Sequence, residues 1–149
     1  MKRLGLVLLV LALTFTACAG KTLDTVISLE PKVADGIRNV QLAVMDQKAG
    51  LEAVNCGQDS QTPPQPVNCY IALQTFIGQI STYNVALADA TQALNTTSAK
   101  TAIANMITPV ENWIMSGILK LPAKVQPFVL VGLEALRTTL LVMQNSLGG

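Results

Sequence analysis

Residues 70–95 read YIALQTFIGQISTYNVALADATQALN and carry the clearest structural pattern in the chain. Apolar residues recur there at alternating spacings of three and four, which places them on one face of an α-helix. The members of this series are Leu73, Phe76, Ile80, Tyr83, Leu87, Ala90 and Leu94. Most of the stability of such a helix comes from packing its apolar face against other elements. The stretch therefore predicts a long helix within a helical domain.

The other face of this predicted helix is polar and uncharged, because residues 60–88 contain no Asp, Glu, Lys or Arg. A neutral hydrated face is the simpler interpretation. The cores of protein interfaces are also depleted of charge, so this face is a candidate interaction surface. The residues proposed for that surface are Gln74, Thr75, Gln79 and Thr82.

Similar spacing predicts helices on either side. The first covers residues 21–55, with its main part starting at Pro31, a residue that suits a first helical turn. The third begins after Ser98, a plausible N-cap. The last covers residues 128–146 and is apolar on more than one face, which is typical of a central helix or of one that also contacts a partner or a membrane.

The third helix contains a signal for a break. Residues 108–111 read TPVE, a capping-box pattern with proline in the first helical position. We therefore expect a kink near Thr108 and a restart over 109–120. The side chains expected to face inward after the restart are Trp113, Ile114, Ile118 and Leu119. No alternating run predicts a sheet. The predicted fold is all-α, a single antiparallel four-helix bundle over residues 23–149 with a kinked third helix and a disulfide-closed first loop.

The N-terminus has the pattern of an export signal. Lys2 and Arg3 precede a mostly apolar run that is too short to span a bilayer comfortably. The sequence FTAC at residues 15–18 resembles the lipobox of bacterial lipoproteins. This resemblance implies removal of residues 1–17, acylation of Cys18 with palmitate or similar chains, and a short tether over 18–22. Ala19, rather than Asp, after the cysteine implies the outer membrane, facing the periplasm.

An ordinary secretory signal remains the alternative. Residues 17–19 form an A-x-A site, and cleavage after Ala19 would discard Cys18 and release a secreted protein.

Cys56 and Cys69 are the remaining cysteines, and they flank a polar, proline-rich segment, GQDSQTPPQPVN. In an exported chain such a pair predicts a disulfide. Closing a loop of this size stabilises the fold by about 3 kcal/mol in the chain-entropy model. A redox-active pair is the alternative, but that chemistry favours the much shorter Cys-x-x-Cys spacing.

Charge and composition exclude several function classes. After loss of Lys2 and Arg3, Lys plus Arg falls from 10 to 8 against 9 Asp plus Glu, and the basic residues are scattered. Nucleic-acid binding and a basic membrane-binding patch are therefore unsupported. The chain has no histidine, which removes the usual catalytic triads and histidine metal sites. No phosphate-binding loop or other catalytic motif is found, so we predict no catalytic residues, no metal site and no cofactor.

Three functions remain. The first is a non-enzymatic envelope lipoprotein, held in the membrane by acylated Cys18, that acts as a structural or protein-interaction module with an envelope protein partner or as a homo-oligomer. The second is a module that binds an apolar ligand or lipid within the helical bundle, lined by Met106, Met115 and Met143. The third is an enzyme of unknown type.

Overall fold

The computed structural model describes residues 2–148, and it describes side chains for residues 23–148. The predicted lipidation site Cys18, the tether over 18–22 and the signal over 1–17 lie outside the residues whose side chains are described. The long helices are α1 (Lys2–Asp46), α3 (Cys69–Gln92), α4 (Thr96–Asn112) and α5 (Gln126–Ser146). The short elements are α2 (Lys48–Glu52), strands β1 (Asn55–Gln58) and β2 (Pro66–Asn68), a π-helical turn η1 (Trp113–Gly117) and a 3₁₀ turn η2 (Ile118–Lys120).

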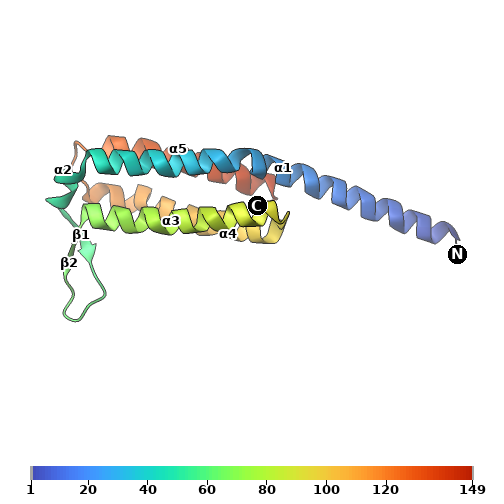
Figure 1. Ribbon diagram of the computed structural model, residues 1–149, viewed down its shortest axis with the longest axis horizontal. Coiled ribbons are helices and arrows are strands. Elements are labelled where there is room, and N and C mark those ends of the chain that lie inside the picture. The colour runs from blue at the N-terminus through green and yellow to red at the C-terminus, as the bar shows by residue number, and fades with distance from the viewer. Residues whose placement is uncertain (1, 149) are drawn as a thin grey trace.

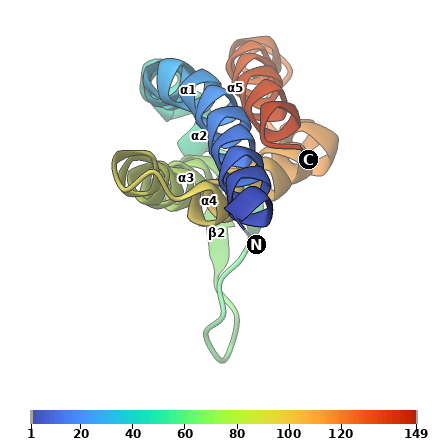
Figure 2. The ribbon, with the colours of Figure 1, turned by 90° about the vertical axis from the view of Figure 1, so that its right-hand side faces the viewer.

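The long helices lie side by side, and a hairpin projects from one end of the group (Figure 1). In the end-on view, α1 and α5 lie above α3 and α4 (Figure 2). Extensive contacts join α1 to α5, α3 to α4, α1 to α3 and α4 to α5. Helices α1 and α5 run in opposite directions, since Gly36 lies against Leu136 while Val40 lies against Gly132. The prediction of a mostly helical fold is confirmed.

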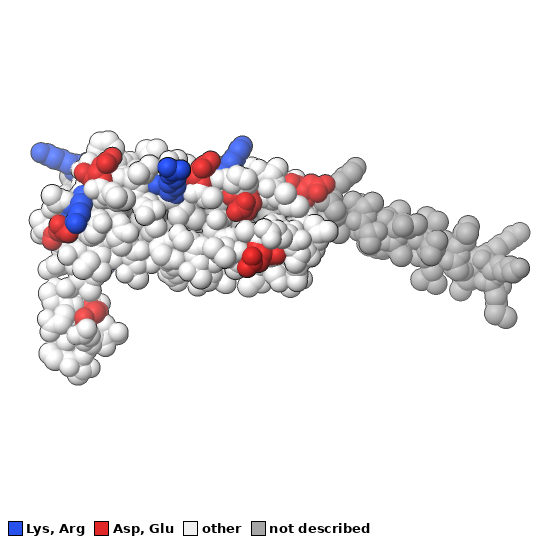
Figure 3. All heavy atoms as spheres, in the orientation of Figure 1, with Lys and Arg blue, Asp and Glu red and all other residues white. Residues whose placement is uncertain are grey.

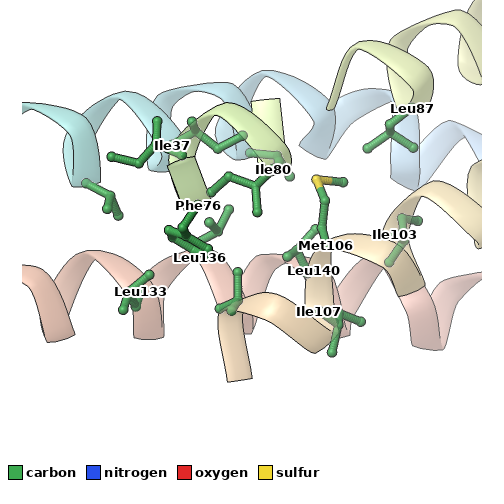
Figure 4. Close-up of a cluster of buried hydrophobic side chains, with 14 of the residues drawn as sticks. Ile37, Phe76, Ile80, Leu87, Ile103, Met106, Ile107, Leu133, Leu136 and Leu140 are labelled. Atoms are coloured by element: carbon green, nitrogen blue, oxygen red, sulfur yellow. The ribbon is translucent and has the colours of Figure 1, made fainter. Parts of the chain in front are cut away.

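The core lies between these helices and is built from the predicted apolar series. Leu73, Ile80 and Leu87 are fully buried, and Phe76 is nearly so. They meet residues of α4 and α5, among them Met106 and Leu140 (Figure 4). Such close packing of aliphatic and aromatic side chains is the main source of stability in a helical domain.

The series ends earlier than its spacing predicts. Helix α3 stops at Gln92, and Leu94 is 70% exposed with a φ angle of 52°. The amide of Asn95 donates to the carbonyl of Ala90 at 2.8 Å, which closes the helix end. A left-handed residue at this position is usual at helix ends, although glycine normally occupies it.

The predicted disulfide joins Cys56 to Cys69, with Cα atoms 4.7 Å apart. The segment between them is not a simple loop, so the expectation of no sheet is wrong for this region. Strands β1 and β2 pair antiparallel, with Gln58 opposite Pro66. At the tip, one carboxylate oxygen of Asp59 accepts bonds from the amide of Gln61 at 3.1 Å and that of Gln65 at 2.7 Å. Local bonds of this kind hold short strands together where hydrophobic alternation is absent.

Two predicted helix starts differ from the structure. Helix α1 runs through Pro31, and Val26 and Val33 on either side of it are fully buried. The N-cap of α4 is Asn95 rather than Ser98, and its side chain accepts a bond from the amide of Ser98 at 2.9 Å. Both residue types cap helices well, so tertiary context decides between them.

The predicted kink near Thr108 is not confirmed. Helix α4 continues past Pro109 to Asn112, and the irregular turns η1 and η2 follow it. The capping box is absent because the hydroxyl of Thr108 donates to the carbonyl of Ala104, while Glu111 accepts from Arg137. Trp113 is half-buried, with its ring centroid 5.7 Å from that of Phe76. Leu119, predicted to face inward, is 72% exposed.

Candidate interaction surface

The outer side of α3 is positioned by its first turn and by its buried face. The side chain of Asn68 caps the helix by accepting a bond from the amide of Ile71 at 2.9 Å. Cys69, the first residue of the helix, is tied to β1 through the disulfide. Burial of Leu73 and Ile80 then fixes the rotation of the helix and turns the opposite side outward.

The four residues predicted for the interaction surface differ in exposure. Thr75, Gln79 and Thr82 are exposed and follow one another along α3, whereas Gln74 is half-buried at the edge. Two apolar residues that the sequence reasoning missed lie at the ends of this row. Ile71 is 52% exposed and Val85 is 60% exposed. We call the set the α3 face, and it consists of Ile71, Thr75, Gly78, Gln79, Thr82 and Val85.

A signal for the missed residues is present in the sequence. Ile71, Thr75, Gly78, Thr82 and Val85 repeat at alternating spacings of four and three, as the buried series does. A second such series on the same helix indicates a second surface able to pack against a helix.

The threonines of the α3 face are less polar than their residue type suggests. The hydroxyl of Thr75 donates to the carbonyl of Ile71 at 2.9 Å, and that of Thr82 donates to the carbonyl of Gly78 at 3.0 Å. Because both hydroxyl protons are used within the helix, these side chains have acceptors but no free donor to offer a partner. The face is therefore suited to close packing more than to a hydrogen-bonded contact.

Gly78 lies in the middle of the α3 face, and no contact within the described residues requires glycine at this position. A methyl group added there would meet no atom outside its own helix backbone and chain neighbours within 4 Å. Glycine inside a helix costs about 1 kcal/mol relative to alanine. An exposed helical glycine permits close approach of another backbone, which is a known use of the residue.

Charge is distributed unevenly around the molecule. Lys, Arg, Asp and Glu gather along α1 and the end of the molecule near α2 (Figure 3). The lower part of the same view, over α3, is almost free of charge (Figure 3). The nearest charged residue to the α3 face along the helix is Asp89, one turn beyond Val85.

Shallow grooves border α3 on both sides. One, of about 290 Å³, lies between Tyr83 and Ala86 of α3 and Thr101 and Asn105 of α4. The other, of about 410 Å³, lies between α3 and α1 and includes Arg38. Asn84 also lines this second groove, and its side-chain oxygen is buried without a hydrogen-bond partner. Buried polar atoms normally have partners, so this oxygen is an exception among the described residues.

Potential metal ligands are dispersed over the described part of the chain. Within 23–148, no three side chains of the Asp, Glu, Cys or His types lie close enough to hold a metal ion. In the described part of the chain, Arg137 pairs with Glu111 and Glu134, and Lys48 pairs with Glu52. The methionines proposed to line an apolar cavity are not brought together, since Met106 and Met143 are fully buried in the core while Met115 is 76% exposed.

By length and composition alone, α5 is the helix in the described part of the chain that could cross a membrane. Its inner side contributes Val129, Leu133 and Leu140 to the core. A core helix of a soluble protein satisfies the same test.

Comparison with known proteins gives no match, because no protein-family model, curated protein or solved structure resembles this chain. The candidate surface is therefore judged on its own geometry.

Proposed function

We propose that the protein is a non-enzymatic lipoprotein of the cell envelope, anchored through acylated Cys18, whose domain is an antiparallel four-helix bundle acting as a protein-interaction module. The observation that carries the interaction role is the α3 face, an exposed and uncharged row of apolar and neutral polar residues with Gly78 at its centre. The lipobox-like sequence at residues 15–18 supports the anchor, and Ala19 after the cysteine supports the outer membrane facing the periplasm.

The geometry of the helices supports an orientation. Helix α1 enters the group of helices at the end where the C-terminus lies, and the hairpin projects from the opposite end (Figure 1). Helix α1 rises about 1.5 Å per residue, so the part from Leu23 to Asp46 is roughly 35 Å long. An anchor at Cys18 would hold the first end near the membrane and direct the hairpin away from it. The α3 face would then stand along the side of the domain, accessible to another envelope protein.

Direct contact at the α3 face is tested by site-specific photocrosslinking in intact cells. A photoreactive amino acid replaces Thr75, Gln79 or Thr82 in the full-length chain, and the matched control carries it at Lys32, an exposed residue of α1. We expect the three α3 positions to give the same crosslinked product, which the control does not give. Equal products from all positions, or none from α3, would contradict the interaction role.

A second variant tests whether the contact needs close approach. Gly78→Leu adds a large side chain where the fold leaves open space, so the domain should remain folded. We expect this variant to lose the product formed at Gln79. Gly78→Ala, which adds a single methyl group, serves as the graded control.

The alternative of an apolar-ligand module has weaker support, because the three methionines proposed as its lining are dispersed between core and surface. Mass spectrometry of lipids extracted with the purified protein separates the two functions. A stoichiometric apolar ligand would favour the alternative.

A further inference from the structure

Helix α5 carries two apolar series on different sides. The buried series packs into the core and consists of Val129, Leu133, Leu136, Leu140 and Met143. The second series is exposed, and we call it the outer seam of α5. It consists of Phe128, Val131, Ala135, Thr138, Val142 and Asn145. The exposed residues follow an uninterrupted spacing of three and four over almost the whole helix, which is the repeat of a two-stranded coiled coil.

The outer seam is uncharged and mostly apolar, with Thr138 and Asn145 as its polar members. Phe128 is 58% exposed, Val131 is 71% exposed and Val142 is 48% exposed. The hydroxyl of Thr138 donates to the carbonyl of Glu134 at 2.8 Å, so its proton is not free. Single exposed apolar residues are common, but a continuous series along one helix is typical of a contact surface.

Charged groups border this seam without entering it. On the side of α4, Arg137 contacts Glu111 at 3.1 Å and Glu134 at 3.7 Å, so these three charges are satisfied within one chain. On the other side lies α1, which carries charges of both signs (Figure 3). An apolar centre with a charged rim is the usual anatomy of a protein interface. Because the rim carries charges of both signs, two identical rims can face each other without bringing only like charges together.

We propose that the outer seam of α5 is the interface between two copies of this protein, which pair through parallel α5 helices. In a two-fold pair each seam residue meets its own equivalent, so a neutral seam opposes no like charges at its centre. The seam of a second copy also has the matching length and repeat. The parallel sense rests on the anchor proposed above, because two chains tethered to one membrane by their N-terminal ends run in the same direction.

The size of this surface predicts a weak pair in solution and a stronger one in the membrane. A helix of this length is about 30 Å long and 10–12 Å wide, so the pair would bury roughly 700 Å² in total, below the usual size of a stable specific interface. Anchoring both copies in one membrane raises their effective concentration without adding contacts.

Cysteine crosslinking of the full-length chain in membranes tests the proposal. Val131→Cys and Val142→Cys are introduced separately, and Gln92→Cys, exposed at the end of α3 and outside the α3 face, is the control for random collision. After mild oxidation and gel electrophoresis without reductant, we expect each α5 variant alone to form a covalent dimer and the control to remain monomeric. Adding Val131→Lys should abolish the dimer formed through Val142→Cys.

Other results would overturn specific parts of the proposal. Dimer yields at the α5 positions no higher than at Gln92, or crosslinks to a different protein, would refute self-pairing while leaving the α3 face unaffected. A dimer that forms only when Val131→Cys and Val142→Cys are combined in one chain would show antiparallel pairing. That result would contradict the parallel sense and the anchored orientation from which it follows.

Discussion

Gly132 of α5 lies directly against Val40 of α1, so that a methyl group at position 132 would lie 2.8 Å from Cγ2 of Val40. The α-carbon of Val40 would be 3.6 Å from the same methyl group. Val40 is fully buried and β-branched, so it has little freedom to move aside. Close contact between α1 and α5 therefore depends on glycine at 132. Gly36, one turn away on α1, faces Leu136 with slightly more room, at 3.3 Å from its Cδ1.

We expect Gly132→Ala to destabilise the fold and Gly36→Ala to leave it nearly unchanged. Overpacking costs about 1–3 kcal/mol, and the gain in helix propensity offsets about 1 kcal/mol at either site. Urea unfolding followed by circular dichroism measures both variants. Combining Gly132→Ala with Val40→Ala should cost less than the sum of the two single losses, because Val40→Ala removes the atom that the new methyl group meets. Equal stability of the two glycine variants would refute this account of the contact.

Leu94→Gly should stabilise the protein. Leu94 adopts a φ angle of 52°, and its side chain is 70% exposed, so little buried surface is lost on substitution. A left-handed conformation costs a residue other than glycine roughly 1–2 kcal/mol. We expect an increase of about 1 kcal/mol in the free energy of unfolding, since glycine also loses more conformational entropy. Leu94→Ala keeps the conformational cost and is the control, and a gain by alanine equal to that by glycine would contradict the prediction.

Removing the disulfide with Cys56→Ser and Cys69→Ser should lower the free energy of unfolding by about 3 kcal/mol. The bond closes the hairpin at the start of α3, and the ammonium of Lys120 also donates to the carbonyl of Cys56 at 3.0 Å. Thermal unfolding with and without reductant gives the same comparison for the unmodified chain. If reductant also lowered the stability of the double variant, the stability lost by the unmodified chain on reduction would not arise from this bond alone.

Arg137→Met should cost less than about 1 kcal/mol, although Arg137 contacts two carboxylates. The side chains of Arg137 and Glu111 are 40% and 36% exposed, so water screens the pair. The difference from the unmodified protein should shrink as salt is added. A loss that is large and insensitive to salt would show that these charges carry more of the contact between α4 and α5 than their exposure suggests.

The sequence pattern predicted the buried side of α3 correctly, because Leu73, Phe76 and Ile80 follow a spacing that only one helix face can satisfy. It did not predict the hairpin, where β1 and β2 are held by the disulfide and by bonds to Asp59 rather than by alternation. Pro109 was expected to break α4, but packing of Met106 and Val110 on either side continues the helix through it.

The candidate surfaces were predictable only in part. Thr75, Gln79 and Thr82 were identified from missing charge, and they are exposed. Ile71 and Val85 were missed because the prediction followed the missing charge alone and did not test for a second series with helical spacing. On α5, apolar residues occupy both the buried and the exposed side, which concealed the outer seam.

The membrane anchor is tested most directly by the intact mass of the mature protein extracted with detergent from its membrane. We predict a chain that begins at Cys18 and carries the added mass of its acyl chains, with two further thiols that react with an alkylating agent only after reduction. A chain that begins at Gly20 without added mass would contradict the lipid anchor, and with it the orientation of the helices and the parallel pairing of α5.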